Sequence, residues 1–243
     1  MEKVLWELLS GRLVAIVRGV GPEEIVDTAR ALAAGGIRAL EITFDHTRAD
    51  GAARTLESIR LLKERMGGEL LLGAGTVLTP EEVDLAVEAG AEYMISTCGL
   101  VSGEIIYSAP DTNPQVVRRT KELGKVSIPG AFTPTEAVEA HRCGADIVKL
   151  FPAALLGVDY LKALRGPLGH IRFSAVGGID ARNAAAFLEA GACCLGVGGT
   201  LVSLPAIRSG QYRLLTDAAR GLCRAVSGAN ASDGGVTRWN AIF

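Results

Sequence analysis

Short apolar runs alternate with amphipathic stretches along most of the chain. An apolar run bounded by turn residues predicts a strand buried on both faces, and apolar residues three or four positions apart predict a helix with one buried side. The expected strands are residues 13–18, 37–44, 70–73, 93–96, 126–129, the run around Lys149, 171–176 and 193–197. The expected helices are a leading one at 2–10 and those near 21–35, 56–62, after 79, at 116–123, after 133, near 161 and at 181–190.

An internal repeat supports this alternation. Residues 79–82 (Thr-Pro-Glu-Glu) and 133–136 (Thr-Pro-Thr-Glu) each offer a threonine N-cap, a proline at the first helical position and a glutamate at the third, which is the pattern of a capping box. Each is followed by a glycine, Gly90 or Gly144, where a left-handed cap lets the chain turn into a strand. Eight parallel strands fed in this way predict a (β/α)8 TIM barrel, with an open doubly wound sheet as the alternative.

The domain organisation follows from the length and from two irregular stretches. A chain of 243 residues suits one barrel of about 250 residues, so we expect a single domain at 1–226. An atypical insertion at about 97–109 interrupts it between a strand and the next helix. Residues 227–235 are rich in Gly, Ser and Asn and predict a flexible linker before an apolar tail at 236–243.

Composition narrows the class of partner. The formal net charge is -2 and no basic block occurs, which argues against a nucleic-acid or anionic membrane surface as partner and favours a small molecule. The first residues lack a signal-peptide core and no apolar run reaches transmembrane length, so we expect a cytoplasmic protein. The five cysteines include no CxxC pair and predict reduced thiols.

Lys149 is the first candidate for chemistry, because it stands in an otherwise apolar strand. It lies five residues after Gly144, and Glu41 lies five residues after Gly36, at the start of another strand. If these glycines begin equivalent strands, the lysine and the glutamate share one height and one face inside the barrel. The alternatives are a lysine that snorkels to solvent and a buried ion pair with a structural role.

A buried lysine and a carboxylate together predict imine chemistry. Desolvation favours the neutral amine, which attacks a carbonyl carbon, and a carboxylate beside it moves protons between water, hydroxyl and carbon. A keto compound is therefore the expected substrate. Arg18, at the end of the first strand, either holds a substrate carboxylate or pairs with Glu41.

Two glycine pairs follow the last two strands, where barrels commonly bind phosphate through backbone N–H groups. They are Gly177-Gly178 and Gly198-Gly199, the second followed by Thr200, and tight turns are the alternative reading. Residues 73–76 (Gly-Ala-Gly-Thr) form a further small turn that presents the Thr76 hydroxyl to the same end.

A metal is not predicted. The three histidines do not converge in a recognisable ligand spacing, although a site made by Asp45, His46 and Glu41 stays open as an alternative.

At these residues the chain resembles the 2-keto-3-deoxy-6-phosphogluconate (KDPG) aldolase and 4-hydroxy-2-oxoglutarate (KHG) aldolase family. The resembling stretches are 16–18, 40–43, 73–78, 129–130, 148–153, 177–179 and 198–199. The resemblance implies a class I aldolase barrel without a cofactor, usually a homotrimer, in which Lys149 forms the Schiff base and Glu41 is general acid and base. It also implies contacts to the pyruvoyl group from Arg18, Thr76, Pro129 and Phe151, and to the phosphate from Gly177, Gly178, Gly198, Gly199 and Thr200.

Three features depart from the family pattern. Asp45, followed by His46, stands where many members have an arginine that binds the substrate acid, so carboxylate binding falls more heavily on Arg18. The insertion at 97–109 leaves the end of a strand, so we expect it beside the mouth of the barrel, where a lid, a partner contact and a disordered excursion are equal alternatives. The tail at 227–243 has no counterpart in the family.

The resulting hypothesis is retro-aldol cleavage of KDPG to pyruvate and glyceraldehyde 3-phosphate, as in the Entner–Doudoroff pathway. Cleavage of KHG to pyruvate and glyoxylate is a second expected activity. A sugar-phosphate isomerase or epimerase on the same barrel, or a catalytically silent self-assembling barrel, are the alternatives.

Overall fold

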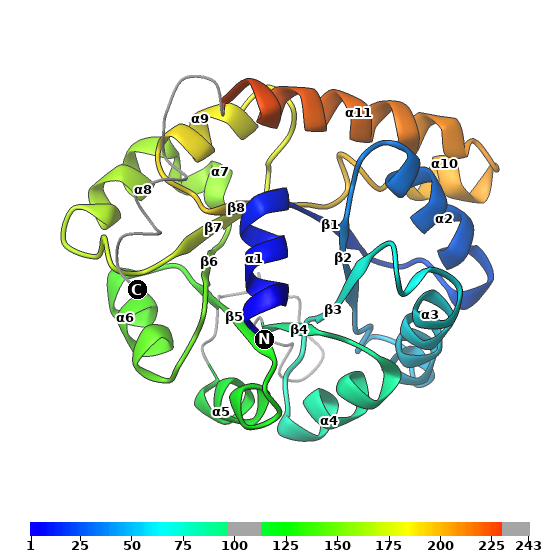
Figure 1. The fold of residues 1–243 in the computed structure, drawn as a ribbon, viewed down its shortest axis with the longest axis horizontal. Helices are drawn as coiled ribbons and strands as arrows, with labels where there is room; N and C mark the ends of the chain where they lie inside the picture. The colour runs from blue at the N-terminus through cyan, green and yellow to red at the C-terminus, as the bar shows by residue number, and fades with distance from the viewer. Residues whose placement is uncertain (97–112, 230–243) are drawn as a thin grey trace.

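Eight parallel strands close into a barrel in chain order, β1 pairing with β8 (Figure 1). The structure is a computed structural model, and it describes residues 1–96 and 113–229. The strands are β1 (Leu13–Val17), β2 (Ala39–Thr43), β3 (Leu71–Gly75), β4 (Tyr93–Ser96), β5 (Val126–Ala131), β6 (Val148–Leu150), β7 (Phe173–Val176) and β8 (Cys194–Val197). The closed barrel confirms the predicted (β/α)8 fold and excludes the open sheet.

Helices surround the barrel and follow the strands (Figure 1). They are α1 (Glu2–Gly11), α2 (Pro22–Ala34), α3 (Gly51–Met66), α4 (Pro80–Ala89), α5 (Pro114–Glu122), α6 (Pro134–Arg142), α7 (Ala153–Leu156), α8 (Val158–Arg165), α9 (Ala184–Glu189), α10 (Leu204–Arg208) and α11 (Tyr212–Ala229). None of the helices in the described ranges is long and apolar enough to cross a membrane.

Strand side chains divide between two cores because successive residues of a strand face opposite sides. Leu40 and Ile42 of β2 belong to the larger cluster, which lies between the strands and the surrounding helices. Ala39 and Val14 belong to a smaller cluster inside the barrel, together with Leu8 of α1. Helix α1 therefore closes the end of the barrel where the strands begin, and it crosses that end in Figure 1.

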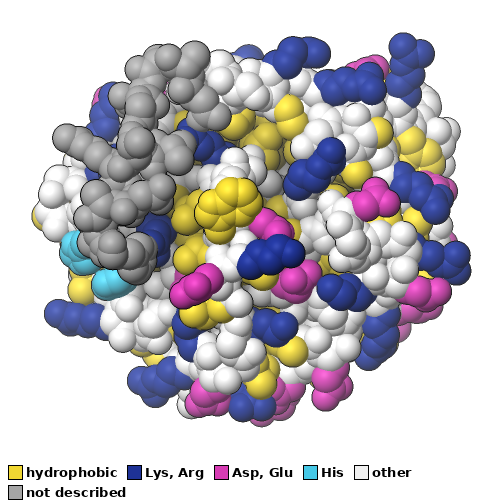
Figure 2. Space-filling model, in the orientation of Figure 1, with side chains coloured by type: hydrophobic (Ala, Val, Ile, Leu, Met, Phe, Trp, Pro, Cys, Tyr) yellow, Lys and Arg dark blue, Asp and Glu magenta, His cyan; other side chains and the backbone are white. Residues whose placement is uncertain are grey.

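Figure 2 shows this closed end from outside. Acidic and basic side chains are interspersed on this face, and hydrophobic atoms gather near its centre. Trp6 of α1 is 66% exposed. The opposite end, where the strands finish, faces away from the viewer and is the mouth of the barrel.

The predicted helix caps form at both repeats, one of them completely. At α6 the Thr133 hydroxyl accepts from the Glu136 N–H at 3.3 Å, and the Glu136 carboxylate accepts from the Thr133 N–H at 2.7 Å. At α4 the Thr79 hydroxyl accepts from the Glu82 N–H, but the Glu82 carboxylate accepts from the backbone of Leu78 instead.

The two glycines from which the positions of Glu41 and Lys149 were counted have left-handed backbone conformations, with φ of 106° at Gly36 and 101° at Gly144. Only glycine adopts this region without strain, so a glycine marks each of these helix-to-strand turns. Glu41 of β2 and Lys149 of β6 each lie five residues after such a glycine.

The last two helices were not anticipated from the sequence. Helix α11 packs against α2 and α9 and buries Leu222, Val226 and Ala229 along one side. It continues through Ser227 and Gly228, where a flexible linker was expected, because its apolar face continues. The rest of that expected linker, the tail, and the insertion at 97–109 lie outside the described residues.

We predict that Thr133→Ala lowers the free energy of unfolding by about 1 kcal/mol, because the N-cap hydroxyl satisfies a helix N–H. Urea denaturation monitored by circular dichroism measures the loss. Thr135→Ala is the matched control, since Thr135 is exposed on the same helix and caps no group in the described structure. Equal stability of the two variants would contradict the assignment of the cap.

Candidate active site

Lys149 and Glu41 both point into the barrel. Their neighbours on either side in the chain belong to the outer core, so the strand alternation turns these two side chains inward. Lys149 is 5% exposed and Glu41 is 2% exposed. The structure thus brings together the two residues that the glycine spacing had selected.

Burial moves both groups toward their neutral forms. Desolvation lowers the pKa of Lys149, the charge of Glu41 opposes this, and the charge of Arg18 reinforces it. Desolvation also raises the pKa of Glu41, whereas the charges of Lys149 and Arg18 lower it. A neutral amine and a carboxyl that can both donate and accept a proton are what imine formation requires.

The two groups interact by charge and make no close ion pair. Across residues 1–96 and 113–229, no nitrogen–oxygen contact of 4.0 Å or less joins Lys149 to Glu41, and Glu41 Oε2 has no hydrogen-bond partner. A buried pair with a purely structural role would need such contacts to offset the cost of desolvation. The observed arrangement leaves both side chains free to meet a ligand.

Two glycines of β3, Gly73 and Gly75, leave room for inward side chains of the neighbouring strands β4 and β2. A Cβ on Gly75 would lie 1.8 Å from Glu41 Oε1, so the carboxyl group rests directly over that residue. A Cβ on Gly73 would lie 2.2 Å from Cε2 of Tyr93. The Gly-Ala-Gly segment, which we expected to form a small turn, is therefore the end of strand β3. Because Gly75 has no side chain, the Glu41 carboxyl group has room to lie over it.

Arg18 and Thr76 meet at the mouth. The Arg18 guanidinium donates to the Thr76 hydroxyl at 3.4 Å, and Thr76 has a φ of 57°, an uncommon conformation for a β-branched residue. Pairing of Arg18 with Glu41, one of the two predicted roles, is not found within 4.0 Å in the described part of the chain. The arginine is exposed and stays available to an anion.

His46 supports Thr76, a role that the sequence did not reveal. Its Nε2 lies 2.9 Å from the Thr76 carbonyl oxygen, and its Nδ1 lies 3.5 Å from a Glu82 carboxylate oxygen. The imidazole thus links the left-handed threonine to the first turn of α4. A histidine after a strand end gives no sequence signal for such a contact, because the contact joins two separate loops.

Asp45 does not replace the arginine that the family pattern led us to look for. Its carboxylate accepts from the N–H and the hydroxyl of Thr47, at 3.0 and 2.5 Å, and these hydrogen bonds lower the pKa of Asp45. Asp45 therefore shapes the loop after β2. No cluster of three or more potential metal ligands occurs in the described ranges, and Asp45, His46 and Glu41 point to different partners.

Phe151 lies beside the lysine. The Lys149 Nζ is 5.2 Å from the centroid of the Phe151 ring. Gly177 accommodates this ring, because a Cβ there would approach it to 2.8 Å. Pro129 is buried in β5, next to Gly130, which pairs with Lys149 in the sheet.

The two glycine loops meet at the ends of β7 and β8. Gly177 and Gly178 have positive φ, and the Thr200 hydroxyl donates to the carbonyl of Ile179 at 2.9 Å, which joins the loops. Three backbone N–H groups here donate to no acceptor among the described residues: those of Gly178, Gly199 and Thr200. Gly198 begins the second loop and accepts two backbone hydrogen bonds. Converging free N–H groups are typical of an anion site.

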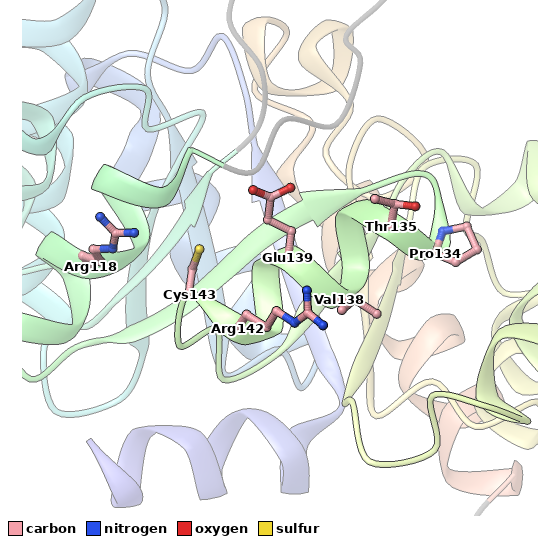
Figure 3. A pocket seen from close by; sticks show the side chains of 7 residues that line it. All are labelled: Arg118, Pro134, Thr135, Val138, Glu139, Arg142 and Cys143. Carbon is pink, nitrogen blue, oxygen red and sulfur yellow. The ribbon is translucent and has the colours of Figure 1, made fainter.

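A separate hollow on the outer surface has no part in this arrangement. It has a volume of about 610 Å³ and lies between α5 and α6, as Figure 3 shows. Its lining residues are Arg118, Pro134, Thr135, Val138, Glu139, Arg142 and Cys143. None of the candidate catalytic or substrate-binding residues lines it.

A family model described as KDPG and KHG aldolase matches residues 5–218. The chain belongs to the KDPG and KHG aldolase family. A 2-dehydro-3-deoxy-phosphogluconate aldolase of Treponema pallidum is 36% identical over 206 residues, or 84% of this chain and 89% of the relative. A 2-dehydro-3-deoxy-6-phosphogalactonate aldolase of Escherichia coli K12 is 33% identical over 190 residues, or 78% of this chain and 83% of the relative.

Solved structures agree with this family membership. The KDPG aldolase of Legionella pneumophila, captured with pyruvate as a covalent carbinolamine intermediate, superimposes with a TM-score of 0.76. It is 27% identical, and the match covers 90% of this chain and 97% of that one. The chain is thus a carbon–carbon lyase of the class I, Schiff-base type, which confirms the predicted enzyme class.

We predict that Gly75→Ala lowers kcat of the aldolase reaction by at least about a hundredfold, because the new methyl group displaces the carboxyl group of the proton-transfer residue. Steady-state kinetics measure the loss, and a thermal melt verifies that the variant folds. Gly68→Ala serves as the control, since a Cβ at that exposed position meets nothing within 4 Å. Wild-type kcat in folded Gly75→Ala would show that Glu41 does not act from its position over β3.

Proposed function

We propose that this aldolase cleaves KDPG to pyruvate and glyceraldehyde 3-phosphate, with Lys149 as the nucleophile. The observation that carries the proposal is the burial of Lys149 and Glu41 side by side in one barrel interior without a close ion pair. Arg18 with Thr76 and the two glycine loops supply anion sites of the kinds that a keto acid phosphate needs.

In the first half of the reaction the neutral Lys149 amine adds to C2 of the substrate. The protonated Glu41 carboxyl gives its proton to the carbonyl oxygen, which becomes the carbinolamine hydroxyl, and the resulting carboxylate takes up the proton lost from nitrogen. The protonated Glu41 carboxyl then gives a proton to that hydroxyl, water leaves, and an iminium ion remains. Each proton thus passes through one carboxyl group, whose raised pKa lets it act in both directions.

In the second half the ionised Glu41 accepts the proton of the C4 hydroxyl. The C3–C4 bond breaks, its electron pair moves into the iminium as an enamine, and glyceraldehyde 3-phosphate leaves. Protonation of the enamine carbon and hydrolysis of the resulting imine release pyruvate and regenerate the Lys149 amine. The iminium is the electron sink, so every bond change is accounted for by lysine, carboxyl and water.

Substrate contacts divide between the two anion sites. Arg18 binds the C1 carboxylate with the Thr76 hydroxyl, and Phe151 and Pro129 cover the apolar side of the pyruvoyl group. The phosphate lies against the loops of Gly177, Gly178, Gly198, Gly199 and Thr200. The free N–H groups of Gly178, Gly199 and Thr200 support this assignment. Backbone donors hold an anion without adding bulk.

The C4 epimer of KDPG is a second candidate substrate, because two relatives are named 2-dehydro-3-deoxy-6-phosphogalactonate aldolases. The two sugar acids differ only where the aldol bond breaks, so they make the same carboxylate and phosphate contacts. KHG is a third, and it lacks a phosphate. From the family resemblance we also propose that the protein forms a homotrimer and is located in the cytoplasm.

We predict that borohydride reduction in the presence of pyruvate adds one pyruvate to the chain, at Lys149. Peptide mapping by mass spectrometry locates the adduct. Lys162→Met is the matched control and retains the adduct, since Lys162 is an exposed lysine outside the barrel, whereas Lys149→Met loses it. An unmodified Lys149 in the wild type would contradict the mechanism, and so would activity abolished by a chelator.

Steady-state kinetics on the same enzyme preparation determine which substrate is preferred. The values of kcat/KM are compared for KDPG, its C4 epimer, KHG and unphosphorylated 2-keto-3-deoxygluconate. We expect KDPG to exceed its unphosphorylated form by at least about a hundredfold, through roughly two charge-assisted hydrogen bonds to phosphate. Equal values for those two compounds would argue against the phosphate site.

A further inference from the structure

Tyr93 of β4 is an inward-facing residue that the reaction above does not use. It is 0% exposed and belongs to the cluster inside the barrel. Its phenol ring lies over Gly73, since a Cβ there would fall 2.2 Å from Cε2 and 2.3 Å from Cζ. Cζ carries the hydroxyl group, so the polar end of the ring reaches across β3 toward β2.

The residue beyond β3 at that level is Glu41. Gly73 pairs with Tyr93 on one side and with Glu41 on the other, while the Glu41 carboxyl rests over Gly75, the next inward position. The phenol therefore lies on the inner side of the barrel directly beneath the carboxyl group. Burial and then the charge of Glu41 raise the pKa of Tyr93 well above its usual range, so the phenol stays a neutral donor.

Three buried polar atoms in this interior have no hydrogen-bond partner within the described structure: Glu41 Oε2, Tyr93 Oη and Ser174 Oγ. Ser174 pairs with Lys149 in the sheet on one side and with Cys194 on the other. Tyr93 of β4 and Cys194 of β8 belong to the same cluster inside the barrel, so the phenol shares this interior with the β8 side. Buried polar groups that have no hydrogen-bond partner in the protein typically bond to an internal water, which makes about three hydrogen bonds.

We propose that Tyr93 is a positioning residue for Glu41, and that it acts through an internal water shared with Ser174 beneath the Schiff-base lysine. The water donates to Glu41 Oε2 and accepts from the phenol. Such donation stabilises the carboxylate form, which is the form that removes the C4 hydroxyl proton. The proposal rests on the proposed aldolase mechanism and adds a group to it that touches no substrate.

The charged and titratable groups around Glu41 are few. Lys149 faces it from β6 and Arg18 from the end of β1, and both lower its pKa. Tyr93 faces it from β4, and Cys194 of β8 lies beyond the phenol. Beside Glu41, strand β3 presents Gly73 and Gly75, which carry no titratable side chain. Among these groups Tyr93 is a neutral donor, so removing its hydroxyl leaves the charges of the site unchanged.

The test is the pH profile of Tyr93→Phe, which removes one oxygen and keeps the ring over Gly73. Loss of the donor destabilises the carboxylate, so the pKa of Glu41 rises further and the base becomes available only at higher pH. We expect the acid limb of the kcat profile for KDPG to move to higher pH by on the order of half to one unit, with kcat on that limb about three- to tenfold lower. KM stays within about twofold, and the borohydride adduct at Lys149 forms in full yield.

Ser174→Ala removes another partner of the same water and is expected to move the acid limb in the same direction. The double variant adds little to either single one, because one water mediates both effects. Ser58→Ala is the matched control: its hydroxyl is also buried without a partner among the described residues, but it lies on helix α3 outside the barrel. Its profile should match the wild type.

An unchanged acid limb in both Tyr93→Phe and Ser174→Ala, with normal adduct at Lys149, overturns the proposal and leaves the aldolase mechanism intact. Absence of the adduct in the wild type instead overturns the mechanism on which the proposal rests. If Tyr93→Phe does not fold, as judged by its thermal melt, Ser174→Ala decides alone, and its unchanged profile overturns the proposal.

Discussion

Exclusion of bulk solvent from the barrel interior is the constraint on which the chemistry depends. Lys149 and Glu41 lie inside a ring of strands whose outer faces are covered by helices, and α1 closes the end opposite the mouth. An ammonium and a carboxylate both lose solvation energy in such a place, so each shifts toward its neutral form. In the proposed mechanism, the fold thus prepares a nucleophile and a proton carrier by where it places two ordinary side chains.

The charge of Arg18 favours one of the possible protonation states of Lys149 and Glu41. Burial alone neutralises both groups, and their mutual attraction alone would ionise both. The charge of Arg18 lowers the pKa of Lys149 and also lowers that of Glu41, so it favours the neutral amine together with the ionised carboxyl. The neutral amine is the nucleophile that adds to the substrate in the proposed mechanism, and the ionised carboxyl is the base that the later bond cleavage needs. The same guanidinium reaches Thr76, so one residue serves both the proton balance and the binding of the substrate acid.

The sequence was sufficient for the barrel and for the two central residues, because both depend on local rules. Glycines at fixed distances after helices set the strand starts, and the alternation of strand side chains then fixed Glu41 and Lys149. Other contacts join distant segments and leave no periodic trace. His46 reads as a loop histidine, and Tyr93 reads as an ordinary core residue of an apolar strand. Their partners, the Thr76 carbonyl and the Glu41 carboxyl, are identified only when β2, β3 and β4 are placed side by side.

The ionisation of Lys149 tests the central claim most directly. Competitive labelling with a trace of an amine-acylating reagent, over a series of pH values and with peptide mapping, gives the pKa of each lysine in the folded enzyme. Lys3, whose side chain is 87% exposed, is the internal reference. We predict that Lys149 titrates clearly below the ordinary lysine value of 10.5. A pKa for Lys149 equal to or above that of Lys3 would contradict the claim that burial makes this amine a nucleophile.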